Sequence, residues 1–307
     1  MTSVKITRIS GSLWGTTYEM AAINGDSGRM QAIFDELTQK CESAVSRFSP
    51  LSELSRVSSE IGDHVVSEDL TDYLESAALG MFLSEGLLDP CIGDALVGLG
   101  YDRDFDTLSE GSLMTKLPRR RFGESVSIDG ESHVFTVRQP CVVDLGATAK
   151  ARCADLIARR VIADGTALGV IIGLGGDLSL AGVAPEDGWP VAIATSAKST
   201  NHGETHRSLA VFGGGVATSS TEVRRWGAGG SEHHHVIDPA TGQSAMSPWR
   251  LVTVLAPSCL EANIAATTAH LQGDLAPQLL ADGGFGAFLV PYEGECIEVG
   301  FWPRSAA

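Results

Sequence analysis

Three adjacent histidines, His233–His235, precede the segment VIDPATG in the last third of the chain. A strand places alternate side chains on opposite faces, so only one or two of these imidazoles can face the same cleft. Pro239 and Gly242 are typical of a tight turn directly after them. An imidazole held beside a rigid turn can accept a proton near neutral pH, which makes His235 a candidate general base. A solvated histidine explains the pattern equally simply.

The segment EANIAATTAH places Asn263 and Thr267 four residues apart, on one face of an expected helix. Two oxygen ligands at this spacing can hold a hard cation such as Mg²⁺ if a backbone carbonyl and a phosphate complete the coordination shell. A small-residue helix that packs closely on its neighbour explains the same pattern without any ligand. The segment alone leaves both interpretations open.

A further polar pair lies in VDLGATAK, where Asp144 follows an apolar segment and Lys150 comes six residues later. Asp144 fits the start of a helix, where a carboxylate accepts hydrogen bonds from unpaired N–H groups and opposes the helix dipole. It fits equally a residue that binds a ring N–H or a hydroxyl of a ligand. Lys150 points at the same site if the helix begins near Ala147.

The glycines of GLGGD, 173–177, do not have the GxGxxG spacing of a dinucleotide-binding fingerprint, and a strand rather than a helix is expected after them. They fit either a hairpin turn or a close approach of the backbone to a ligand.

The basic stretch KLPRRRF, 116–122, is conspicuous in an acidic chain. It fits a solvated loop, or a contact for a phosphate or an acidic partner.

Hydrophobic periodicity predicts the elements that must position these segments. Helices are expected over 27–46, 70–85, about 147–165 and 260–272. Strands are expected at Val142–Val143 and in ALGVIIG, LSLAG, WPVAIATS, HRSLAVFGGGVATSS and RLVTVLAP, with a hairpin at each end of the chain. Hairpins mixed with strand–helix units predict an α+β fold with mixed or antiparallel sheets and packed helices.

Two local details of these elements are also predicted. The helix over 70–85 is expected to turn Leu74, Ala77, Ala78, Met81 and Phe82 inward, because these residues recur at helical spacing. Asp89-Pro90 and Gly93-Asp94 are both typical of turns.

The composition limits the classes of function. The 307 residues include 38 acidic and 22 basic side chains, a net charge of −16, which repels phosphate backbones and argues against nucleic acid as a partner. No apolar run approaches the length of a membrane span, and the first residues lack the apolar core of a signal peptide, so a cytoplasmic location is expected. The six cysteines lack CxxC spacing and are expected to be buried, reduced thiols.

Six segments, taken together and in this order, resemble those of the ApbE-like flavin transferases, the FAD:protein FMN transferases. They are RFSPLSELSRVSS, EGLLDPCIGDAL, VDLGATAKARCADL, GLGGDLSLAG, GVATSSTEVRR and HVIDPATG. The resemblance covers nearly the whole chain and implies a single domain over 1–307 with an ApbE-like, T-fold-like architecture. Two lobes with the FAD site in the cleft between them are one form that this domain can take.

The resemblance implies a transferase that moves FMN from FAD to a threonine or serine hydroxyl of an acceptor flavoprotein and releases AMP. Such a phosphoryl transfer needs in-line positioning, neutralisation of phosphate charge and deprotonation of the attacking hydroxyl, and Mg²⁺ is the expected cation. Asn263 stands where the family usually has an aspartate. Two alternatives therefore stay open: an FAD-binding flavin carrier or regulator, and an FAD pyrophosphatase, each with a weakened metal site.

The resemblance also implies roles for individual residues. His235 corresponds to the base, which makes its two neighbours incidental, and Lys150 is expected to serve both in catalysis and in flavin binding. The cation is expected to contact the backbone carbonyl of Ala147 and the side chains of Asn263 and Thr267. The remaining flavin-binding positions are Trp14, Phe48, Leu88, Asp89, Pro90, Asp144 and Ile237.

Two of these positions depart from the family pattern. Trp14 stands where the family commonly has a methionine, and Phe48 where it commonly has a tyrosine. Either aromatic ring can stack on the flat isoalloxazine ring of the flavin.

Overall fold

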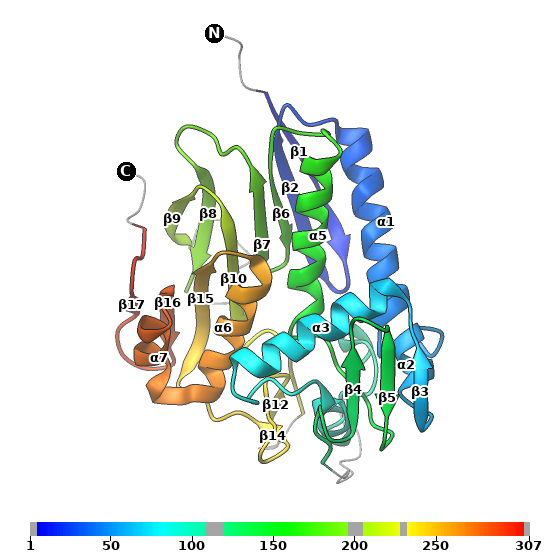
Figure 1. Ribbon diagram of the computed structural model, residues 1–307. Coiled ribbons are helices and arrows are strands. Elements are labelled where there is room, and N and C mark those ends of the chain that lie inside the picture. Colours follow the sequence, from blue (N-terminus) through cyan, green and yellow to red (C-terminus); the bar gives the residue numbers. More distant parts are fainter. Residues whose placement is uncertain (1–4, 109–118, 196–204, 228–231, 304–307) are drawn as a thin grey trace. The chain divides into compact units, whose positions relative to one another are not determined.

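The computed structural model describes residues 5–108, 119–195, 205–227 and 232–303. The chain divides into two compact units. Unit 1 comprises residues 1–37, 150–223 and 247–307, and unit 2 comprises residues 38–149 and 224–246. Both units contain helices and antiparallel strand pairs (Figure 1), which confirms the predicted α+β class.

Unit 1 is built on an eight-stranded sheet in which every neighbouring pair is antiparallel. In spatial order its strands are β1 (Ile6–Leu13), β2 (Thr16–Ile23), β6 (Gly169–Leu174), β7 (Asp177–Gly182), β10 (Gly214–Ser220), β15 (Trp249–Ala256), β16 (Gly286–Pro291) and β17 (Ile297–Val299). A separate hairpin pairs β8 (Trp189–Ala194) with β9 (Thr205–Val211). The hairpins predicted at both ends of the chain are confirmed as β1–β2 and β16–β17.

Side-chain alternation along the strands gives this sheet an apolar surface on each face. On β15, Leu251 belongs to a core cluster that also contains Trp189 and Leu209 of the β8–β9 hairpin. The next residue, Val252, belongs to a second cluster with alanines of α6 (Cys259–Gln272) and α7 (Ala276–Asp282). The short 3₁₀ helix η3 (Gly273–Leu275) joins these two helices. A sheet buried on both faces explains the continuous apolar runs in its central strands.

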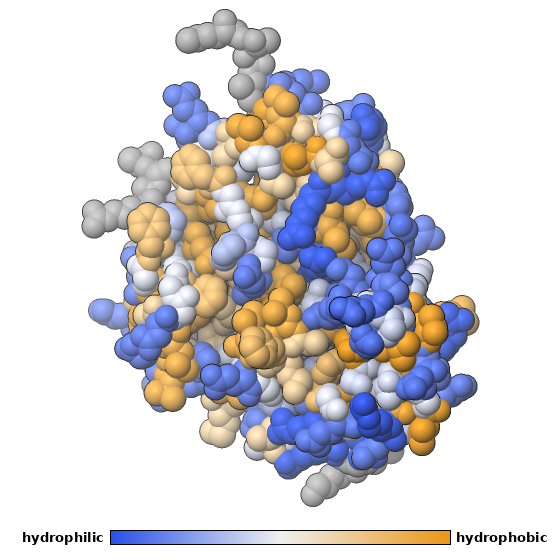
Figure 2. All heavy atoms as spheres, in the orientation of Figure 1, coloured by the Kyte–Doolittle hydropathy of each residue, from blue (hydrophilic) through white to orange (hydrophobic). Residues whose placement is uncertain are grey.

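Two longer helices also belong wholly or partly to unit 1. The helix predicted over 27–46 is confirmed as α1 (Ser27–Val45), whose buried side chains include Met30 and Phe34. Figure 2 shows mostly hydrophilic side chains on the exposed side of this helix. Helix α5 (Ala149–Ala163) begins slightly later than predicted.

The predicted strand at Val142–Val143 is wrong, because these residues lie outside every strand of the described chain. Their backbone groups find other partners. The N–H of Val142 donates to Asp94 Oδ1 at 3.1 Å, and the N–H of Asp144 donates to the carbonyl of Pro90 at 2.8 Å. These bonds tie the segment before α5 to the residues around Pro90 without forming a ladder.

Unit 2 contains short helices, a small sheet and several two-residue strand pairs. Its helical segments are α2 (Glu53–Val57), α3 (Glu68–Leu83), η1 (Pro90–Ile92), α4 (Gly93–Gly98) and η2 (Phe105–Thr107). The sheet has the order β3 (Gly62–Val65), β5 (Val134–Val137), β4 (Val126–Asp129). The strand pairs are β11 (Arg225–Trp226) with β12 (His233–His234), and β13 (Ile237–Asp238) with β14 (Gln243–Ser244).

Two details predicted for this unit are wrong. Phe82 is 78% exposed, because the buried stripe of α3 runs through Leu70, Tyr73 and Ala77 on another face of the helix. Gly93 begins helix α4 instead of forming a turn with Asp94. A Cβ atom at Gly93 would lie 2.2 Å from the carbonyl oxygen of Val142, so this glycine allows two backbone segments to approach closely.

The buried carboxylate of Asp155, on α5, fixes the start of α6. Its two oxygens accept the N–H groups of Cys259 at 3.1 Å and Leu260 at 3.0 Å, and the hydroxyl of Ser179 donates to it at 2.6 Å. The first N–H groups of a helix have no partner within the helix and carry its positive dipole end, so an anion is favoured there. Asp155 therefore joins α5, β7 and α6.

We expect Asp155→Asn to lower the free energy of unfolding of unit 1 by about 3 kcal/mol, because an amide nitrogen would replace one acceptor against a helix N-terminus. Chemical denaturation followed by circular dichroism measures the loss. Asp164→Asn is the matched control, since Asp164 lies just beyond the same helix and pairs with Arg160 near the surface. Its cost should stay below about 1 kcal/mol, and equal costs for the two variants would contradict the role of Asp155.

Candidate functional site

In unit 1, five polar side chains gather where β7 begins beside α6. The carboxylate of Asp177 accepts from Asn263 Nδ2 at 2.6 Å and from Lys150 Nζ at 3.2 Å. One turn further along α6, the hydroxyl of Thr267 donates to Ser219 Oγ of β10 at 3.3 Å. Three residues predicted for the site, Lys150, Asn263 and Thr267, thus belong to this unit.

The GLGGD segment positions Asp177. It forms the turn between β6 and β7, with Gly175 at a φ of +64°, which confirms the hairpin interpretation. A Cβ atom at Gly176 would lie 2.8 Å from the carbonyl oxygen of Thr218, so the turn packs against β10. The glycines let the hairpin turn tightly and bring Asp177 beside α6.

The donor set of this cluster fits a hard cation. Over the described ranges no three His, Cys, Asp or Glu side chains gather as a metal site would require, so a cation there needs amide, hydroxyl or backbone oxygens. Asn263 is 7% exposed, and its Oδ1 atom is buried without a hydrogen-bond partner among the described residues. A buried acceptor without a partner is uncommon and indicates a place for a ligand. Oxygen donors of this kind suit Mg²⁺.

In unit 2, Asp144 forms a buried ion pair with Arg47. The guanidinium of Arg47 donates through Nε to Asp144 Oδ2 and through Nη1 to the carbonyl of Tyr101 at 2.9 Å, and its side chain is 6% exposed. The same guanidinium lies 4.1 Å from the ring centre of Phe48 and 4.6 Å from that of Tyr101. Arg47 therefore holds the predicted flavin-binding residues Phe48 and Asp144 in one cluster.

Asp144 also shapes its own loop. Its Oδ1 atom accepts the N–H of Gly146 at 2.7 Å, an arrangement typical of an Asx turn. A carboxylate has about four lone-pair positions. The two interactions of Asp144 thus leave acceptor capacity for a ligand N–H or hydroxyl.

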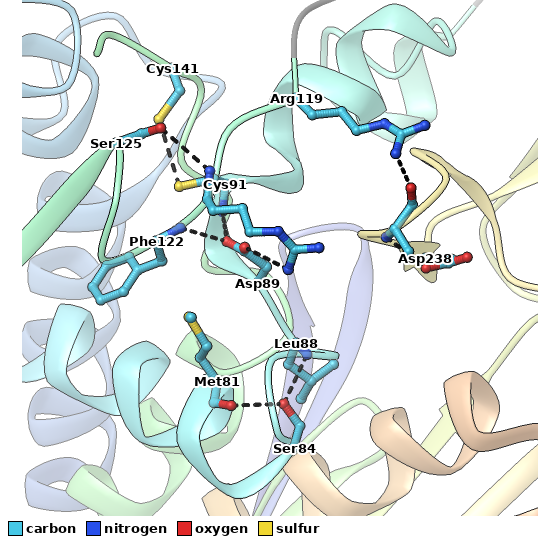
Figure 3. Close-up of polar contacts among 12 residues, drawn as sticks. Met81, Ser84, Leu88, Asp89, Cys91, Arg119, Phe122, Ser125, Cys141 and Asp238 are labelled. Carbon is cyan, nitrogen blue, oxygen red and sulfur yellow. Dashed lines mark hydrogen bonds and ion pairs between the residues drawn. The ribbon is translucent and has the colours of Figure 1, made fainter. Parts of the chain in front are cut away.

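Asp89 is a buried centre of polar contacts in unit 2 (Figure 3). Its Oδ1 atom accepts the N–H of Cys91 at 2.9 Å and the N–H of Phe122 at 3.1 Å, and Arg121 Nη1 lies 3.9 Å from Oδ2. Leu88 and Pro90 beside it are also buried, and the N–H of Leu88 donates to Ser84 Oγ at 2.9 Å. Asp89 is 3% exposed, so its carboxylate stabilises this loop from inside.

The described part of the basic stretch, Arg119–Phe122, contacts its own unit. The guanidinium of Arg119 donates to the carbonyls of Ala240 and Thr241, in the turn after the histidines. Residues 116–118 of the stretch lie outside the described residues. Arg119 thus serves to hold the turn of VIDPATG.

The three histidines have different surroundings, as strand alternation predicts. His234 is buried, its Nε2–H donates to the carbonyl of Ala245 at 3.1 Å, and desolvation lowers the pKa of its imidazole. His233 lies beside the ring of Trp226, with 6.2 Å between ring centres. His235 is half-buried and directly follows β12, two residues before β13 begins. The neutral, buried His234 is a packing residue, and the base role of His235 stays a prediction.

Two predicted flavin-binding residues have surroundings that restrict how they can act. Ile237 is 3% exposed and packs with Leu96, Leu99 and Tyr101, so its side chain belongs to a core cluster. Trp14 is half-buried in the turn of the β1–β2 hairpin, with a φ of +52°. Its stacking on flavin stays a prediction.

The cysteines are free thiols, but they are not all buried as expected: Cys141 is half-buried and Cys296 is exposed. Cys296 lies in the short link between β16 and β17, where the hairpin meets solvent. Cys141 Sγ lies 3.8 Å from Cys91 Sγ, and this contact together with burial raises the pKa of the Cys91 thiol.

Sequence patterns missed three residues that organise these clusters: Arg47, Asp155 and Asp177. Asp155 carried a usable signal, because it lies among the buried residues Ala151, Ala154 and Ala158 on one helix face. A charged residue on such a face is almost always paired. Arg47 and Asp177 carried none, because their partners are distant in sequence.

The ApbE family matches residues 14–289 of the chain. The FAD:protein FMN transferase of Vibrio cholerae serotype O1 is 27% identical over 275 residues, covering 87% of this chain and 81% of that protein. The FAD:protein FMN transferase of Salmonella typhimurium is 24% identical over 314 residues, covering 96% of this chain and 87% of that protein.

Solved structures show the same fold. The flavin transferase ApbE from Vibrio cholerae has a TM-score of 0.78 at 22% identity, covering 97% of this chain and 98% of the other. The ApbE protein from Thermotoga maritima has a TM-score of 0.80 at 18% identity, covering 96% and 97%. With a family match over most of its length and this fold, the chain belongs to the ApbE family.

Proposed function

We propose that this chain is an FAD:protein FMN transferase that links FMN through a phosphoester to a threonine or serine hydroxyl of an acceptor flavoprotein. The observation that carries the proposal is the family match over residues 14–289, at nearly full length. The polar clusters of both units support it, because each contains residues that the resemblance assigns to the reaction.

The proposed reaction is a substitution at phosphorus. The acceptor hydroxyl oxygen forms a bond to the phosphorus of the FMN half, the bond from that phosphorus to the bridging oxygen breaks, and AMP leaves with that oxygen. The hydroxyl proton passes to the imidazole of His235, which lies three residues before the turn at Asp238. This turn is well fixed, since Asp238 accepts the N–H of Ala240 at 2.8 Å and the N–H of Gly242 donates to the Asp238 carbonyl at 2.7 Å.

In this proposal unit 2 binds the flavin half of FAD. Phe48 is 40% exposed, which leaves one part of its ring free to stack on an isoalloxazine ring. Asp144 accepts a hydrogen bond from the flavin, while the charge-assisted bond from Arg47 keeps the carboxylate in place. Asp89 holds Leu88 and Pro90 in their loop, and these residues contribute backbone and apolar contacts.

In the same proposal unit 1 supplies groups that act on the phosphates. The Lys150 side chain is 28% exposed, and its ammonium favours an anionic phosphate nearby. Asn263 and Thr267 would hold a divalent cation, for which Mg²⁺ is proposed. When bound, this cation would neutralise charge that develops on the phosphate oxygens.

The two alternatives differ in their products. A flavin carrier would bind FAD and release nothing, and an FAD pyrophosphatase would release AMP with water in place of the acceptor hydroxyl.

The described helices include none that is both long and apolar enough to cross a membrane. The cytoplasmic location stays a prediction, which cell fractionation would check.

We expect the purified chain, given FAD, Mg²⁺ and an acceptor with a flavinylation sequence, to produce a fluorescent acceptor and an equal amount of AMP. Gel fluorescence and mass spectrometry of the acceptor measure the linked FMN. The control acceptor has alanine in place of the target threonine and should stay unmodified. AMP without any acceptor would indicate the pyrophosphatase, and FAD binding with neither product would indicate the carrier.

His235→Ala should slow transfer on the order of a hundredfold, because proton transfer from the hydroxyl loses its acceptor. FAD affinity, measured by flavin fluorescence, should change little. The matched control is His233→Ala, which removes a neighbouring imidazole beside Trp226 and should leave the rate near that of the unmodified chain. A large loss of FAD affinity in His235→Ala would instead place His235 among the residues that bind the flavin.

A further inference from the structure

The contact between Asp177 and Asn263 fixes the orientation of the Asn263 amide. Both residues are buried, at 2% and 7% exposed, and 2.6 Å separates Asp177 Oδ1 from Asn263 Nδ2. The other carboxylate oxygen of Asp177 accepts from Lys150 at 3.2 Å. An ionised carboxylate can only accept hydrogen bonds, so it must face the amide nitrogen of Asn263. The amide oxygen therefore points away from Asp177.

That amide oxygen is buried without a hydrogen-bond partner in the described part of the chain. Thr267, on the next turn of α6, gives its hydroxyl hydrogen to Ser219, and a hydroxyl that donates keeps its acceptor lone pairs. One helix face thus presents two oxygen acceptors, one of them held by a charged neighbour. A hard cation can satisfy two such oxygens at once.

The charge at this place has an unusual distribution. A neutral amide occupies position 263, where the family usually has an aspartate. The negative charge of Asp177 lies within hydrogen-bond distance of that amide. An amide whose nitrogen faces a carboxylate is polarised so that its oxygen becomes more negative, an effect that is stronger in a buried place than in water.

We propose that Asp177 is a positioning residue for the cation of the proposed reaction: it orients Asn263 with the carbonyl oxygen outward and supplies the negative charge that Asn263 lacks. This inference rests on the cation site in the proposed function. It deepens that proposal, because a neutral asparagine then forms part of a competent cation site. Asp177 acts through Asn263 and not as a ligand.

Asp177→Asn is the first test. The new amide can donate to Asn263 Oδ1, which turns the Asn263 side chain and occupies the oxygen that would bind the cation. Negative charge is lost as well. The dissociation constant for Mn²⁺, measured by electron paramagnetic resonance on the chain without FAD, should rise at least about tenfold. Asp274→Asn removes the same charge from an exposed position in the same unit and should change nothing.

Asn263→Asp and the exchange Asp177→Asn/Asn263→Asp complete the test. The single change places two carboxylates in contact, so the melting temperature without a cation should fall and its rise with Mn²⁺ should be larger than in the unmodified chain. The exchange restores one carboxylate and one amide, and the introduced asparagine can donate to the introduced aspartate. It should recover most of the Mn²⁺ affinity lost in Asp177→Asn.

Several results would overturn the inference. Unchanged Mn²⁺ affinity in Asp177→Asn would do so, as would an exchange variant that folds yet binds Mn²⁺ no better than Asp177→Asn. An unmodified chain that binds no Mn²⁺ at millimolar concentration overturns it too. If Asp177→Asn does not fold, the Mn²⁺ affinity of the exchange variant is compared with that of the unmodified chain, and this comparison tests the inference instead. Flavin transfer is assayed separately, so Mn²⁺ binding that depends on Asp177 without transfer would refute only the proposed function.

Discussion

The carboxylate of Asp155 is the constraint on which unit 1 depends. It is a charge in a nearly dry place, 3% exposed, and it is stable there because the first N–H groups of α6 and the hydroxyl of Ser179 satisfy its oxygens. Three elements distant in sequence must meet for these bonds to form. Once they meet, the start of α6 is fixed against β7, and with it the positions of Asn263 and Thr267 beside Asp177.

Unit 2 uses a charged side chain in a comparable way. Arg47 is almost fully buried, and it is held by Asp144, by the carbonyl of Tyr101 and by two aromatic rings. Removing one partner from such a buried pair leaves a charge without compensation, which is much more costly than losing a surface pair. The loop that carries Phe48 and the loop that carries Asp144 are therefore coupled, so a change at either should disturb both.

Much of the fold could be predicted from periodicity. The helices α1 and α6 and the hairpins at both ends were visible, because apolar residues recur at helical or alternating spacing and glycines mark the turns. The segment Val142–Val143 was wrongly predicted as a strand, since two valines indicate an extended backbone but not which groups pair with it. Asp94 takes the N–H of Val142 and the Pro90 carbonyl takes that of Asp144, directly after the segment, and neither acceptor is a neighbour in sequence.

The candidate site could be predicted from the sequence only in part. Residue types and spacing indicated three candidate groups for the site: the pair Asn263 and Thr267, the pair Asp144 and Lys150, and one of the three histidines. The order of the segments along the chain indicated the family. The partners were not predictable, because Asp177 lies 86 residues from Asn263 and Arg47 lies 97 residues from Asp144. Phe82 shows a related limit: helical spacing alone placed it on the buried face, whereas tertiary packing chose another face of α3.

The row of histidines shows how local geometry can separate chemically identical side chains. Burial removes water from His234, so its imidazole is held neutral, and the Ala245 carbonyl takes its one N–H. A base that must cycle between neutral and charged forms needs room for the charge, and His234 lacks it. His235 follows directly, only half-buried, before a turn fixed by Asp238. Adjacent residues thus divide into one that stabilises the loop and one, His235, whose role as the base stays a prediction.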